Sequence, residues 1–167
     1  MDGAADCLDF LNSALENTNM TSSPTNKIPM WVNILQAILI AIMLQQVYLF
    51  SLDHQAVAAS GISVDGTNAN LNMLYEFAAR TATMAIVSLI VLITQNPRYF
   101  LVILLMNIFR EGLETIIDPL YPLVNAPMSP AADLAVHIVI VAIEICAFIT
   151  VYKIVRRMDK TAVGIKN

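Results

Sequence analysis

Charged residues are scarce in this chain. Asp, Glu, Lys and Arg make up 13% of its 167 residues, whereas a soluble domain carries about 25%. Apolar residues make up 57%, and the mean hydropathy is +0.67. This deficit of charge indicates that much of the surface is solvated by lipid rather than by water. No basic patch is large enough for nucleic acid, so we expect no nucleic-acid partner.

Cysteine and catalytic motifs are also nearly absent. The two cysteines are Cys7, in a polar segment, and Cys146, in an apolar run, and no CxxC is present. Because they are expected at different depths, we predict no disulfide between them. The motifs HExxH and GxSxG and the phosphate-binding P-loop are missing as well. The sequence thus predicts no catalytic residue, no metal site and no cofactor, and it disfavours an enzyme.

Four long apolar runs lie at about 28–52, 72–94, 98–117 and 132–155. Each has about the 20 residues that a helix needs to cross a hydrocarbon core of about 30 Å. The runs are continuous rather than alternating, which favours helices. A soluble all-α protein would need a polar face on each helix, and the apolar runs offer almost none. We therefore predict an all-α integral membrane protein, a four-helix transmembrane bundle.

The chain divides into three parts around these runs. Residues 1–27 are a polar segment, 28–157 form the transmembrane domain, and 158–167 form a basic tail. The N-terminal segment contains three leucines at helical spacing, which would suit one face of a short interfacial helix: Leu8, Leu11 and Leu15.

The links between the runs differ in composition. Residues 53–71 are polar and read as a loop, and Gln95-Asn96-Pro97 reads as a tight turn. The third helix is expected to end at Asp118-Pro119. Four prolines in 118–131 then predict an extended link.

Basic residues predict the orientation. Seven of the nine Lys and Arg residues fall on one side of a four-span arrangement: Lys27, Arg98, Lys153, Arg156, Arg157, Lys160 and Lys166. Basic residues beside spans favour the cytoplasmic side, so we expect cytoplasmic termini, most simply in a plasma membrane. Asn19-Met20-Thr21 is a glycosylation sequon, and its modification in a eukaryotic host would invert this topology.

Ionisable and amide side chains interrupt the last three runs. Burying an ionised group in lipid costs a few kcal/mol, so each such group needs a partner or a function. Glu76 and Arg80 are four residues apart, in the order that favours pairing on one helix face. The candidate polar residues are Glu76, Arg80, Asn107, Arg110, Glu111, Glu114, His137 and Glu144.

Helical rise places most of these residues in the outer half of the bilayer. At 1.5 Å per residue, Arg110 lies roughly 18 Å above the inner end of its helix, and Arg80 lies roughly 12 Å below the outer end of its own. We therefore predict a charged outer cavity that takes a polar headgroup, a lipid or a quinone. The structural alternative is mutual neutralisation that clamps the helices together. Glu144, near the midplane, would be either protonated or paired with an arginine.

Two further patterns involve histidine and amide side chains. His54 and His137 are both expected near outer helix ends, where a bis-histidine haem is geometrically conceivable, but two histidines are commonplace in a chain. Amide side chains in the first run would hydrogen-bond between helices: Asn33, Gln36, Gln45 and Gln46.

Three short motifs resemble the DoxX-like group of small four-helix membrane proteins. They are Tyr75-Glu76-Phe77-Ala78-Ala79-Arg80, Asn96-Pro97-Arg98 and Phe109-Arg110-Glu111-Gly112, within a similarity that spans about 28–157. An arginine in the second helix and another in the third recur in that family, which corresponds to Arg80 and Arg110. The resemblance implies a fold more than an activity.

These observations leave three functions open. The first is a small-ligand-binding or accessory membrane protein. The second is a proton- or ion-coupled carrier or channel subunit with Glu144 in a relay, although the inner helix halves lack polar residues. The third is a subunit of a larger membrane complex. The expected partners are membrane lipid and either a second copy of the chain or other membrane subunits.

Overall fold

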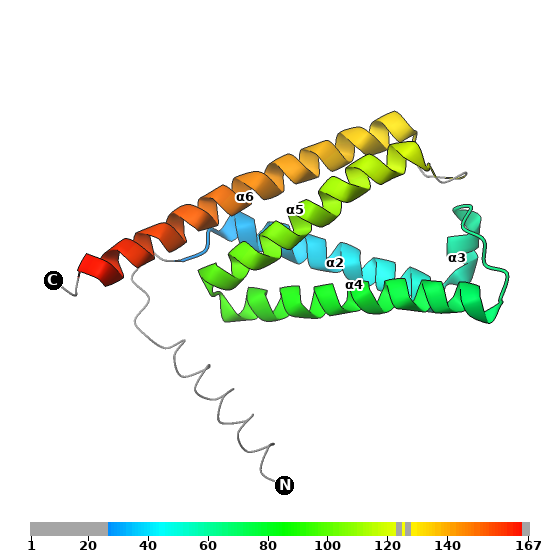
Figure 1. The fold of residues 1–167 in the computed structure, drawn as a ribbon, viewed down its shortest axis with the longest axis horizontal. Helices are drawn as coiled ribbons and strands as arrows, with labels where there is room; N and C mark the ends of the chain where they lie inside the picture. Colours follow the sequence, from blue (N-terminus) through cyan, green and yellow to red (C-terminus); the bar gives the residue numbers. More distant parts are fainter. Residues whose placement is uncertain (1–26, 123–124, 126–127, 165–167) are drawn as a thin grey trace, which may run out of the picture.

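The structure, a computed structural model, describes residues 27–122, 125 and 128–164. Secondary structure in these ranges is entirely helical, which confirms the all-α prediction at that level. The helices are α2 (Met30–Leu52), α3 (His54–Ala59), α4 (Asn68–Thr94), α5 (Pro97–Leu120) and α6 (Pro130–Gly164), shown in Figure 1. The predicted interfacial helix at Leu8, Leu11 and Leu15, the sequon and Cys7 lie outside the described residues.

Local capping explains the tight return between α4 and α5. Gln95 ends α4 in a left-handed conformation with φ of 52°, and the Asn96 side chain accepts a hydrogen bond of 3.0 Å from the Arg98 amide. Pro97 occupies the first helical turn, where it needs no amide hydrogen. The two-residue connection reverses the chain, so α5 runs antiparallel to α4.

The 53–71 link contains a short helix of its own. The Asp53 carboxylate accepts a hydrogen bond of 3.0 Å from the Ala56 amide and so begins α3. Val57 is buried and holds this helix against the rest of the chain. Thr67 then caps α4 through the amide of Asn70, at 3.4 Å.

Two predicted helix ends differ from the structure. The expected stop at Asp118-Pro119 is wrong by two residues, because α5 continues through Pro119 to Leu120. A proline in the last turn removes only one intrahelical hydrogen bond, so it does not end the helix at once. Helix α6 runs past the expected end at 155 to Gly164. An ion pair of 2.7 Å joins Asp159 in this extension to Arg98.

The long helices form two antiparallel pairs, α2 with α4 and α5 with α6. Figure 1 shows the pairs converging at the end where the α4–α5 turn lies and diverging towards the opposite end. Apolar side chains from all four long helices bury one another near the convergence: Ile28, Val32, Val91, Phe100, Ile103, Leu104, Ala147 and Val151.

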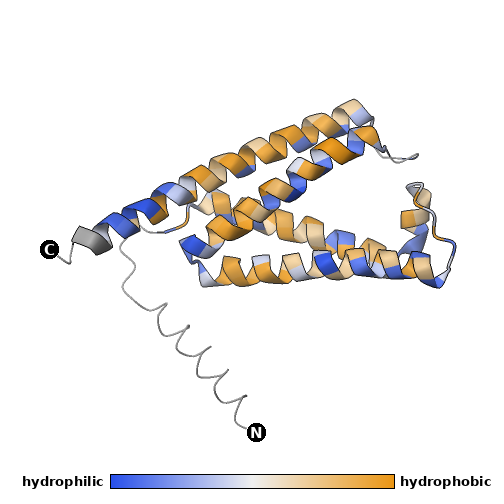
Figure 2. Ribbon diagram, viewed as in Figure 1, coloured by the Kyte–Doolittle hydropathy of each residue, from blue (hydrophilic) through white to orange (hydrophobic). Residues whose placement is uncertain are grey.

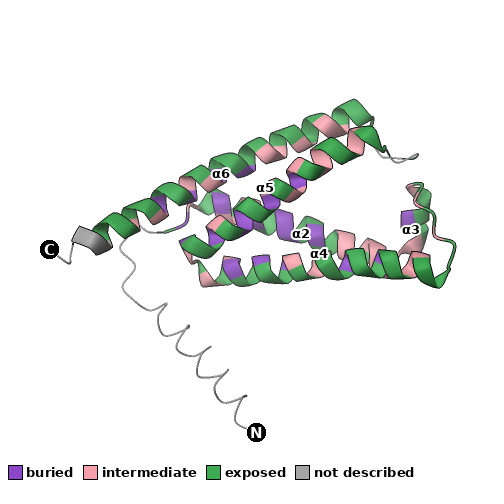
Figure 3. Ribbon diagram, viewed as in Figure 1, coloured by how far each residue is buried: buried purple, intermediate pink, exposed green. Residues whose placement is uncertain are grey.

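The outward faces of the helices are strongly apolar. Large side chains such as Ile93, at 72% exposed, and Val102, at 58%, point away from the protein. Figures 2 and 3 show that exposed positions are mostly hydrophobic along much of each long helix. Water would not stabilise such a surface, whereas lipid would.

Three helices are long and apolar enough to cross a membrane: Met30–Leu52, Asn68–Thr94 and Pro130–Thr161. This confirms the membrane prediction at the level of these three helices. Helix α5 differs from them because it carries Arg110, Glu111 and Glu114 within two turns. The composition of α5 alone therefore does not show that it crosses a membrane.

Candidate functional site

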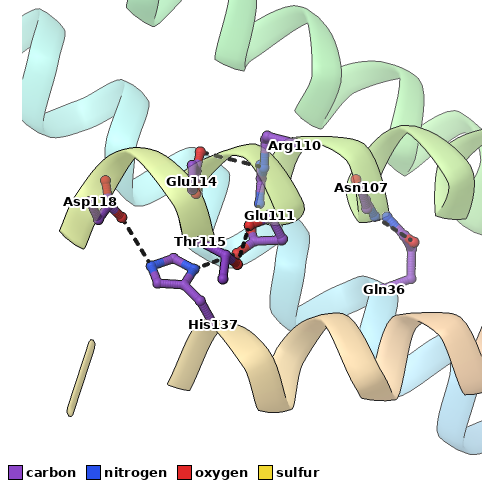
Figure 4. Close-up of polar contacts among 8 residues, drawn as sticks. All are labelled: Gln36, Asn107, Arg110, Glu111, Glu114, Thr115, Asp118 and His137. Atoms are coloured by element: carbon purple, nitrogen blue, oxygen red, sulfur yellow. Dashed lines mark hydrogen bonds and ion pairs between the residues drawn. The ribbon is translucent and has the colours of Figure 1, made fainter. Parts of the chain in front are cut away.

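Polar side chains gather between α5 and α6 around the ring of His137. Its Nδ1 lies 3.1 Å from a carboxylate oxygen of Glu111, and its Nε2 lies 3.2 Å from one of Asp118. Figure 4 shows the ring extending from α6 to the space between these two α5 side chains. Asp133, one turn before His137 on α6, approaches the same Nε2 to 3.9 Å. The histidine thus joins the two helices through carboxylates on both sides.

Arg110 supplies the other cationic group of this region. Its guanidinium contacts the Glu111 carboxylate, and its Nε lies 3.9 Å from Glu114. The side chains of Arg110 and Glu111 are only 20% and 6% exposed. Arg110 therefore neutralises carboxylates within the helix pair rather than in solvent.

We define the polar cluster as Arg110, Glu111, Glu114, Asp118, Asp133 and His137. Four carboxylates against one arginine give a formal charge of −4 + 1 = −3 with a neutral His137, or −2 with a protonated one. With all four carboxylates ionised, the site is negative in either state of His137, so it attracts cations and repels anions.

Two sets of donors in the polar cluster could hold a metal ion. They are Glu111, Glu114 and His137, and Asp118, Asp133 and His137. Both sets depend on His137, whose two ring nitrogens already face carboxylates at hydrogen-bond distance. A metal ion would have to displace one of those contacts, so the geometry favours an organic cation that can hydrogen-bond to the carboxylates.

An apolar depression of about 320 Å³ adjoins the polar cluster on α5 and α6. Its lining is Gly112, Thr115, Ile138, Val141, Ala142 and Ile145. Thr115 borders both regions, because its hydroxyl donates a 2.6 Å hydrogen bond to the Glu111 carbonyl. At Gly112 a side chain would find no heavy atom within 4 Å, so the missing side chain leaves the depression open.

Two of the sequence candidates lie apart from the polar cluster. Arg80 pairs with Glu76 at 2.8 Å on α4, and their side chains are 80% and 54% exposed. Asn72 donates a further hydrogen bond of 3.0 Å to Glu76. Of the predicted site residues, Arg110, Glu111, Glu114 and His137 therefore lie together in the structure. Glu76 and Arg80 do not contact them.

Asn107 and Glu144 lie deeper, in the middle of the bundle. Both are fully buried, and the Asn107 amide lies 3.5 Å from the Gln36 side-chain oxygen. Neither carboxylate oxygen of Glu144 has a hydrogen-bond partner within the described part of the chain. The expected interhelical role of Gln36 is thus seen, whereas an arginine partner for Glu144 is not found among those residues.

The two histidines predicted as a haem alternative are engaged separately. His54 lies against Tyr75, with ring centroids 5.8 Å apart, while His137 is held by carboxylates. Asp118 and Asp133 belong to the polar cluster but were not among the predicted site residues. Their spacing was a signal, because Asp118 lies four residues after Glu114 and Asp133 lies four residues before His137.

No protein-family model, curated protein or solved structure matches this chain. Its function is therefore inferred from the geometry of the described residues.

Proposed function

We propose that the chain is a four-span membrane protein that binds a cationic amphiphile at the polar cluster. The apolar depression takes the hydrocarbon chain and the polar cluster takes the headgroup. The observation that carries this proposal is their adjacency on the same helix pair, since a negative site and an apolar surface together fit a molecule with both properties.

Connectivity supports a crossing by α5. The two-residue turn after α4 reverses the chain, and α5 then packs antiparallel along α6. Because α5 packs along α6, a crossing by α6 favours a crossing by α5 beside it. The 24 residues of α5 make a helix of about 36 Å, which exceeds the hydrocarbon thickness of about 30 Å.

Basic residues support cytoplasmic termini. Lys153, Arg156, Arg157 and Lys160 line one surface near the end of α6. Arg98, at the start of α5, reaches the same end through its ion pair with Asp159. A cytoplasmic assignment for this end puts the polar cluster in the outer half of the bilayer, as in a plasma-membrane protein. The resemblance to the DoxX-like group is untested and stays a prediction.

The charge of the site argues for a cationic headgroup. Asp118 and Asp133 are partly exposed carboxylates of the polar cluster, at 40% and 29%. They face His137 rather than Arg110, so their charge remains available to an incoming ammonium group. The depression is lined by apolar side chains and opens to the outward surface of α5 and α6.

Binding of a fluorescent alkylammonium probe, with a primary amine as its headgroup, to the full chain in nanodiscs tests the proposal. Asp118→Asn together with Asp133→Asn should weaken binding by about tenfold, since each lost charge contact contributes roughly 1 kcal/mol or less. Asp65→Asn, in the exposed α3–α4 link, is the matched control and should bind like the unmodified chain. Equal binding of an alkyl sulfate probe of the same length, or no effect of the double substitution, would overturn the proposal.

A further inference from the structure

Each of the four long helices contributes one fully buried polar side chain to the interior of the bundle. We define the central layer as Gln36 on α2, Ser88 on α4, Asn107 on α5 and Glu144 on α6, all of which are 0% exposed. The other buried side chains of these four helices are mostly apolar. One polar group from every long helix at such burial is unusual, because buried polar groups normally occur with partners.

Helix register puts these residues at similar depth. Asn107 contacts Gln36 directly, at 3.5 Å. His137 lies between Glu111 and Asp118, and therefore about 11 Å along α5 from Asn107. Glu144 is seven residues beyond His137 on the antiparallel α6, which is also about 11 Å. Glu144 and Asn107 are therefore level with each other.

Ser88 lies within about one turn of the same level. Gln95 donates a 3.0 Å hydrogen bond to Asn33, which aligns the end of α4 with the start of α2. From this contact Gln36 is about 5 Å along α2 and Ser88 is about 11 Å along α4. The difference of about 6 Å is close to one helical pitch.

Several polar atoms of the central layer have no hydrogen-bond partner within the layer. Within the described part of the chain, the buried atoms with no hydrogen-bond partner are Gln36 Nε2, Ser88 Oγ, Asn107 Oδ1 and both Glu144 carboxylate oxygens. Four of these five atoms are oxygens. No Lys, Arg or His in the described residues forms an ion pair with Glu144. An ionised Glu144 in this setting needs a cation from elsewhere.

We propose that the central layer is a binding site for a single sodium ion. Oxygen donors suit hard cations, and the side-chain oxygen of Asn107, which is level with Glu144, would join the carboxylate as a ligand. One carboxylate and one monovalent cation sum to zero charge, which an apolar core tolerates. A divalent ion would leave a net positive charge there. A proton on Glu144 would also neutralise the carboxylate, and the sodium dependence of the measurements below separates these two occupants.

This site uses none of the residues of the polar cluster. His137 lies roughly 11 Å from the central layer along the helices, whereas Arg110 and Glu111 lie within about 6 Å of Asn107 along α5. Binding of the ammonium probe can therefore be measured with sodium absent, so failure of one proposal leaves the other to be judged separately.

Thermal unfolding of the full chain in nanodiscs tests the sodium site. The chain is compared in sodium chloride and in choline chloride at equal ionic strength. Sodium should raise the unfolding temperature by about 4 °C or more, because a ligand that binds only the folded state stabilises it. Glu144→Gln should remove this difference, and Glu76→Gln, at an exposed carboxylate, should retain it.

Equilibrium dialysis with radioactive sodium gives a second measurement that needs no variant. The unmodified chain should retain about one ion per molecule, a stoichiometry set by the single carboxylate of the central layer. The proposal is overturned if the unmodified chain unfolds at the same temperature in both salts, or if it retains no sodium. It is also overturned if Glu144→Gln keeps the sodium-dependent shift.

Discussion

At the scale of single residues, burial separates side chains that the sequence makes look alike. Arg80 and Arg110 both lie within helices and both have a carboxylate four residues away. The side chain of Arg80 is 80% exposed, whereas that of Arg110 is 20% exposed. The cost of losing each arginine should differ accordingly, since only a buried ion pair leaves an uncompensated charge when it is broken.

Arg110→Leu should destabilise the folded chain by about 3 kcal/mol, the usual loss when one partner of a buried ion pair is removed. The Glu111 carboxylate, 6% exposed, would then lack its arginine. Arg80→Leu is the matched control and should leave stability close to that of the unmodified chain. Unfolding by denaturant in lipid measures both, and equal losses for the two variants would contradict the assigned burial.

The sequence predicted most of the residues that form the polar cluster, but it did not predict which of the candidate residues lie together. Ionisable side chains in apolar runs stand out by composition, and Arg110, Glu111, Glu114 and His137 do lie together. The relation between Arg80 and this group depends on how the helix pairs diverge. That divergence is a property of packing between helices, and hydropathy carries no record of it.

At the scale of helices, α5 combines the polar cluster with the apolar depression. The two sets alternate along the helix, with Gly112 and Thr115 in the depression and Glu111 and Glu114 in the polar cluster. A helix whose two adjacent faces differ in this way can hold both ends of an amphiphile. The resemblance motif Phe109-Arg110-Glu111-Gly112 covers this junction.

Gly112→Leu should fill the depression without disturbing the protein. A side chain at this position meets no heavy atom within 4 Å, and replacing an interior helical glycine should stabilise the helix by about 0.5 kcal/mol. Binding of the alkylammonium probe should fall while the unfolding temperature stays the same or rises. Unchanged probe affinity in a stably folded variant would exclude the depression as the chain-binding surface.

Helix existence was predictable, whereas several helix ends were not. Apolar runs of about 20 residues fix the four long helices, because their length follows from the bilayer. The ends depend on local hydrogen bonds, such as the Asp53 cap of α3 and the continuation of α5 through Pro119. Composition alone predicted a loop where α3 forms, and it predicted that the third helix ends at Asp118-Pro119.

At the scale of the whole molecule, the placement of the polar cluster depends on α5 crossing the membrane between α4 and α6. A reentrant or surface position for α5 would put the polar cluster in water and remove the basis for a site within the bilayer. The crossing places the α4–α5 turn and the α5–α6 link on opposite sides. Gln95 lies at the first and Asn125 at the second, and both are exposed.

Labelling with a membrane-impermeant maleimide tests this crossing most directly, with Gln95→Cys and Asn125→Cys introduced singly into a chain whose Cys7 and Cys146 are replaced by alanine. If α5 crosses, Asn125→Cys should react in intact cells and Gln95→Cys should react only after permeabilisation. Reaction of both positions from the same side would show that α5 does not cross, and would contradict the four-span bundle.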